Sequence, residues 1–98
     1  MSYLAEFYSL VKQMAAGRFA TQPEVNRAMI SLRSYVIRVR RDFQMNAGVR
    51  HELDEILRIP AGAVSPAEFR AMGEAAEPRV REFFARTGHA ELLSVLRK

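Results

Sequence analysis

Residues 21–46 read TQPEVNRAMISLRSYVIRVRRDFQMN, the longest uninterrupted helical pattern in the chain. Thr21 and Glu24 have the spacing of a capping box, in which the hydroxyl accepts the N–H of the third helical residue and the carboxylate reaches back to the N–H of the cap. Pro23 is compatible with the first turn, where an N–H has no partner within the helix. The sequence therefore predicts a long helix over about residues 22–46.

Apolar side chains recur in this helix every three or four residues and form one stripe, within roughly 60° either side of Leu32. A strand over residues 35–40 is the competing interpretation, because these residues alternate in polarity and are rich in β-branched side chains. We favour the helix, because its period continues through both flanks and no Gly or Pro bounds the segment. The stripe predicted to face the core consists of Val25, Ala28, Met29, Leu32, Tyr35, Val36, Val39 and Phe43.

Two isoleucines, Ile30 and Ile37, lie seven residues apart on the opposite face of this helix, with arginines around them. In one interpretation another helix of the chain covers them while the arginines extend to water. In the other they form an exposed partner-binding surface with a basic rim. The residues predicted to bind a partner are Arg27, Ile30, Arg33, Ile37, Arg38 and Arg41.

The remainder of the chain predicts shorter helices around the long one. Helical patterns cover about residues 3–16, 49–58, 66–76, 78–86 and 89–97. Gly17 is a typical residue at which a helix stops, and Ser65 and Glu68 form a second capping box with Pro66 at the first helical position. Pro78 is expected either to kink the fourth helix or to begin a fifth. The predicted fold is all-α: one domain over residues 1–98, a compact five- to six-helix bundle around a central helix at about 22–46.

Composition narrows the class of protein. The chain has 98 residues, no cysteine, 49% hydrophobic residues and a net charge of +4, so disulfide scaffolds and thiolate metal sites are excluded. Of its 15 basic residues 13 are arginine, a bias that points to a GC-rich, bacterial genome as well as to an acidic partner. Without a leader-like start or an apolar run long enough to span a membrane, we expect a cytoplasmic protein.

No arrangement typical of catalysis occurs in the sequence. His51 and Glu55 stand four apart on one helical face, but a zinc site of this type needs a second histidine where Glu55 stands. The paired carboxylates lie on predicted outer faces beside arginines, and there is no phosphate-binding loop or nucleophile motif. We therefore predict neither an enzyme nor a cofactor or metal site.

Two functions remain. The first is a small protein–protein interaction module, such as a regulator, adaptor, chaperone or inhibitor, which binds an acidic and apolar partner surface and is also compatible with a homodimer through the isoleucine pair. The alternative is a nucleic-acid-binding protein that places the arginines of residues 33–50 on phosphates. We favour the first, because isoleucines rather than aromatic side chains lie between the arginines.

Overall fold

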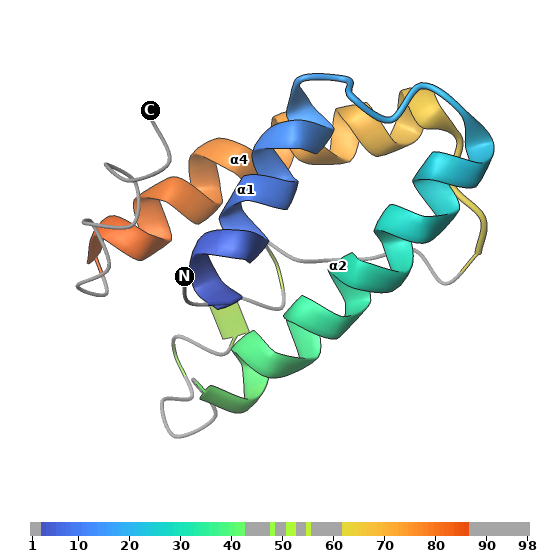
Figure 1. Ribbon diagram of the computed structural model, residues 1–98. Coiled ribbons are helices and arrows are strands. Elements are labelled where there is room, and N and C mark those ends of the chain that lie inside the picture. The colour runs from blue at the N-terminus through green and yellow to red at the C-terminus, as the bar shows by residue number, and fades with distance from the viewer. Residues whose placement is uncertain (1–2, 43–47, 49–50, 53–54, 56–61, 87–98) are drawn as a thin grey trace.

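Three helices form the framework of the computed structural model, which describes residues 3–42, 48, 51, 52, 55 and 62–86 (Figure 1). They are α1 (Tyr3–Ala15), α2 (Gln22–Asp42) and α4 (Pro66–Arg86). The described residues contain no strand. The radius of gyration, 13.0 Å, is that of a compact chain of this length, about 13 Å for 100 residues. The prediction of a compact, all-α fold is confirmed.

The predicted number of helices, five to six, does not match the three helices that the described residues form. Pro78 accounts for part of the difference, since α4 continues through it from Pro66 to Arg86 instead of ending near Ala76. The ring of Pro78 removes one hydrogen bond, to the carbonyl of Glu74. Burial of Val80, Phe83 and Phe84 on the far side offsets that loss, because tertiary packing stabilises a helix more than local propensity does.

Some predictions concern residues that the structure does not describe. The end of the long helix near residue 46, the loop at residues 59–61 and the last helix at residues 89–97 lie outside the described residues. Gly48, His51, Glu52 and Glu55 are described and have helical backbone.

The ends of the helices follow their local sequence signals. Gly17 has a φ of 72°, and its N–H donates to the carbonyl of Met14 at 3.0 Å, as in a glycine that follows a helix. The Ser65–Glu68 capping box is complete, with side chain to backbone distances of 3.2 and 3.3 Å. In the first box the Glu24 N–H lies 3.4 Å from the Thr21 hydroxyl, but the Glu24 carboxylate accepts from that hydroxyl at 2.8 Å rather than from the backbone N–H.

Helix α1 lies between the other two helices, whereas the sequence predicted that the long helix, α2, would be central. The contact between α2 and α4 is the smallest of the three helix–helix contacts. The closest packing is between α1 and α4, where a Cβ built on Gly73 would lie 2.4 Å from the backbone nitrogen of Ala15. Only a residue without a side chain permits this approach. The buried core consists of Ala5, Phe7, Tyr8, Val11, Met14, Val25, Ala28, Met29, Leu32, Val36, Val39, Val64, Phe69, Val80, Phe83 and Phe84.

An aromatic pair attaches the connection between α1 and α2 to helix α4. Phe19 packs edge-on against Phe69 of α4, with ring centroids 5.3 Å apart. This geometry is favourable for two aromatic rings. It attaches the connection to α4, and from there α2 runs back at an angle to α1, so that its far end meets the beginning of α1 (Figure 1).

Candidate protein interface

Ile30 and Ile37 are exposed on the side of α2 that faces away from the core. Their relative exposures are 68% and 58%, and they are the only large hydrophobic side chains of the described residues with this degree of exposure. Helical geometry explains their position, since the six buried residues of α2 occupy the opposite side. No described element covers them, so the interpretation in which a second helix buries this pair is not what the described residues show.

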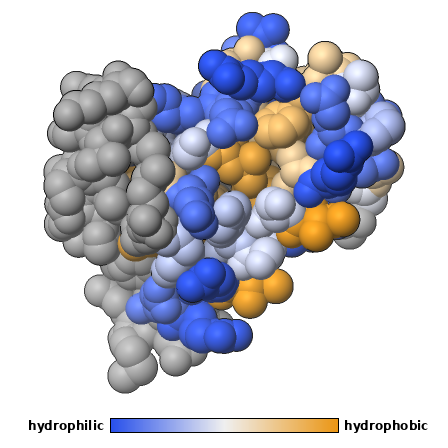
Figure 2. Space-filling model, in the orientation of Figure 1, coloured by the Kyte–Doolittle hydropathy of each residue, from blue (hydrophilic) through white to orange (hydrophobic). Residues whose placement is uncertain are grey.

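All four arginines predicted to flank the isoleucines are exposed as well. Arg27, Arg33 and Arg41 surround the pair directly, each three or four residues from an isoleucine and therefore adjacent to it on the helix. We call Arg27, Ile30, Arg33, Ile37 and Arg41 the outer face of α2. In Figure 2 hydrophobic residues along α2 lie beside strongly hydrophilic ones.

Arg38, the sixth predicted residue, has a contact within the fold. Its guanidinium lies 4.2 Å from the centroid of the Tyr3 ring, a cation–π geometry. The Tyr3 hydroxyl donates to the carboxylate of Asp42. Burial raises the pKa of Tyr3 above its usual value, and the hydrogen bond to Asp42 raises this pKa further. Arg38 thus helps to attach the beginning of α1 to the end of α2.

A second tyrosine joins the same two helices one turn earlier along α2. The Tyr35 hydroxyl donates to the Glu6 carboxylate at 3.4 Å, and its ring packs against Phe7 with centroids 6.3 Å apart. Burial raises the pKa of Tyr35, and the negative charge of Glu6 adds to this effect. We call these contacts of Tyr3 and Tyr35 the tyrosine clamp.

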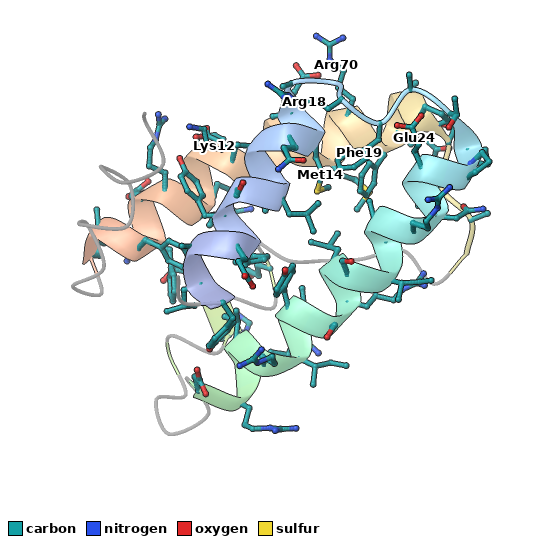
Figure 3. All side chains as sticks on the ribbon, in the orientation of Figure 1. Lys12, Met14, Arg18, Phe19, Glu24 and Arg70 are labelled. Carbon is teal, nitrogen blue, oxygen red and sulfur yellow. The ribbon has the colours of Figure 1, made fainter. Side chains whose placement is uncertain are left out.

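Between the clamp and the α1–α2 connection the two helices leave a groove, which the sequence did not predict. It consists of two adjoining hollows, each of about 330 Å³. Phe19 and Glu24 lie at its upper end in Figure 3, and hydrophobic residues form its floor in Figure 2. The helical patterns of the sequence give no angle between the two helices, so they could not reveal this groove. The residues shared by both hollows are Leu10, Gln13 and Ser31.

Several other charged groups of the described residues form surface pairs. His51 Nε2 lies 3.4 Å from Glu55 Oε1, and the other oxygen of Glu55 lies 4.0 Å from the guanidinium of Arg79. Arg86 binds the carboxylate of Glu52. Among the described residues no three histidine or carboxylate side chains are grouped as metal ligands would be.

Comparison with known proteins gives no further guide, because no protein-family model, no curated protein and no solved structure matches this chain. None of the three described helices is long and apolar enough to cross a membrane.

Proposed function

We propose that this chain is a small, non-enzymatic, cytoplasmic protein that binds another protein through the outer face of α2. The observation that carries the proposal is the exposure of Ile30 and Ile37, at 68% and 58%, on a fold whose core does not use them. Burying a side chain of this size contributes about 1.5–3 kcal/mol to association. Isoleucines fixed at two positions of a well-packed helix are suited to such a contact.

The arginines determine what kind of surface would fit. Arg27, Arg33 and Arg41 are exposed beside the isoleucines, and a guanidinium pairs best with a carboxylate, through two parallel hydrogen bonds. The proposed partner surface is therefore acidic around an apolar centre. Arg38 contributes less to this surface, because its guanidinium packs on the ring of Tyr3.

The test compares partner capture by matched variants. The tagged protein is incubated with lysate of its own organism in the presence of nuclease, alongside Ile37→Asp and the control Ala75→Asp, which places the same charge on an exposed residue of α4. We expect the wild-type and control proteins to capture a stoichiometric protein that Ile37→Asp does not. Equal capture by a folded Ile37→Asp variant would show that the outer face of α2 is not the binding surface.

Nucleic-acid binding is the second candidate. The exposure of Arg33, Arg40 and Arg41 on one helix favours it, because arginines in a row can neutralise successive phosphates. Loss of all captured material on nuclease treatment, together with a steep fall in affinity for arbitrary duplex as salt rises, would select this function instead.

A further inference from the structure

Five residues of α2 form a row with the spacing used when one helix packs along another. Arg27, Ile30, Ser34, Ile37 and Arg41 are separated by three, four, three and four residues, and all five are exposed. On a helix they lie within an arc of about 80° and extend over about 21 Å. We call this row the α2 seam. In a coiled coil the same alternation defines the residues that meet the facing helix.

We propose that the α2 seam binds an amphipathic helix of another protein, with apolar side chains opposite Ile30 and Ile37 and acidic side chains opposite Arg27 and Arg41. This inference rests on the proposed function and specifies its partner. The seam has an arginine at each end and isoleucines between them. The complementary helix therefore has carboxylates at the ends of its contact stripe and aliphatic residues in the middle.

The acidic residues of α2 do not change the sign of this surface. Its two carboxylates, Glu24 and Asp42, lie about 100° around the helix from the middle of the seam. Glu24 accepts the hydroxyl of Thr21 at 2.8 Å, and Asp42 accepts the hydroxyl of Tyr3. The charge that a partner meets along the seam is positive.

A second copy of the chain fits the seam less well than an acidic helix. In a parallel pair each isoleucine meets its own copy, but Arg27 and Arg41 then also face their own copies, and like charges at such positions repel. In an antiparallel pair the isoleucine positions of one copy face the positions of Arg27, Ser34 and Arg41 in the other copy. Each isoleucine then faces a serine or an arginine. Neither orientation pairs both the isoleucines and the arginines favourably.

Other classes of partner use only part of the seam. An extended strand has no backbone groups to bind, because those of the α2 interior are paired within the helix. Nucleic acid would place hydrated phosphates against Ile30 and Ile37, and an anionic membrane would gain only two aliphatic side chains from this face. These partners become alternative outcomes of the test.

The test uses two synthetic helical peptides of about three heptads, with the same leucines in the middle of the contact stripe and with either glutamate or lysine at the ends of that stripe. Binding to the folded protein is measured by fluorescence anisotropy at physiological ionic strength. We expect the wild type to bind the acidic peptide at least about tenfold more tightly than the basic one. Ile37→Asp should weaken binding of the acidic peptide by on the order of tenfold, as expected for a central contact.

Charge reversal provides the sharper comparison. The double variant Arg27→Glu/Arg41→Glu should prefer the basic peptide, because the end positions of the seam then carry the opposite sign. If this variant does not fold, Arg27→Gln/Arg41→Gln replaces it, and the preference of the protein for the acidic peptide should fall towards parity. Circular dichroism verifies the helical content of each variant.

Several results would overturn the inference. The first is that the wild type binds the two peptides equally or binds neither. The second is that it binds anionic vesicles or arbitrary duplex more tightly than the acidic peptide. The third is that the wild type forms a homodimer that Ile37→Asp dissociates. The peptide test can fail while capture from lysate still depends on Ile37, in which case only the partner assignment is wrong. Capture that does not depend on Ile37 would remove the proposed function itself.

Discussion

Gly73 determines how closely α1 and α4 approach. A Cβ at this position would lie 2.4 Å from the Ala15 nitrogen and 2.5 Å from the Met14 Cβ, distances that no packing adjustment of a flexible side chain can relieve. We predict that Gly73→Ala destabilises the protein by about 3 kcal/mol, because extra atoms in a filled contact force the backbone apart. Urea denaturation followed by circular dichroism measures this loss.

Two other glycines provide matched controls for that change. Gly17 has a φ of 72°, so Gly17→Ala should cost about 1–2 kcal/mol through backbone strain. Nothing lies within 4 Å of a Cβ at Gly62, and Gly62→Ala should be neutral or stabilising by about 0.5 kcal/mol. A Gly73→Ala variant as stable as Gly62→Ala would contradict the observed helix crossing.

Val36 and Ile37 are neighbours in sequence with opposite roles. Val36 is 5% exposed and Ile37 is 58% exposed. Val36→Asp should destabilise by about 3–5 kcal/mol, enough to unfold a domain this small, because it buries an unpaired charge. Ile37→Asp should change the free energy of unfolding by no more than about 0.5 kcal/mol, because its carboxylate remains in water beside Arg33 and Arg41. Thermal melts of both variants test this difference, and unfolding by Ile37→Asp would place Ile37 in the core.

At the scale of the element, the length of α4 differs from what its local sequence predicts. Pro78 is exposed inside a helix of 21 residues and removes one backbone hydrogen bond. We predict that Pro78→Ala stabilises the protein by about 1–3 kcal/mol, because it restores the bond to the Glu74 carbonyl without changing a buried residue. The shift in the urea midpoint measures this gain, with exposed Ala75→Gly as a control that should be destabilising. A loss of stability on Pro78→Ala would mean that the proline supports the path of α4.

The three helices also show which features of the fold can be predicted from the sequence. Capping boxes predicted the starts of α2 and α4, and periodicity predicted the six buried residues of α2, because both depend on residues within one or two turns. Of the other two residues of the predicted stripe, Tyr35 is partly buried and Phe43 lies outside the described residues. The length of α4 and the position of α1 between the other helices depend on contacts such as that of Gly73 with Ala15, which are remote in sequence. The part of Arg38 in the tyrosine clamp was missed for the same reason, since Tyr3 lies 35 residues away. That the outer face of α2 binds a partner stays a prediction.

At the scale of the whole molecule, the tyrosine clamp makes the free energy of unfolding depend on pH in the alkaline range. The pKa of Tyr3 is raised by burial and by Asp42, so the folded state holds this proton above pH 10, where the unfolded chain releases it. By linkage, the contribution of Tyr3 is complete below about pH 10 and is lost as pH rises beyond it. We predict that wild type is more stable than Tyr3→Phe by about 1 kcal/mol at neutral pH, and that this difference shrinks above pH 10.

Urea unfolding of both proteins across this pH range measures the effect. The other tyrosines titrate in both proteins, so the difference between the two isolates Tyr3. A difference that stays constant from pH 7 to pH 11 would show that the Tyr3 hydroxyl is not held by Asp42.

Helix α2 separates the side chains that pack in the core from those that are exposed on its other side. Its buried stripe and its seam share no residue, and the seam is exposed along its whole length. A library that randomises positions 27, 30, 34, 37 and 41 would therefore vary specificity while leaving the packing intact. The chain can in this way serve as a small, cysteine-free display scaffold, on which selection for new ligands need not compete with selection for folding.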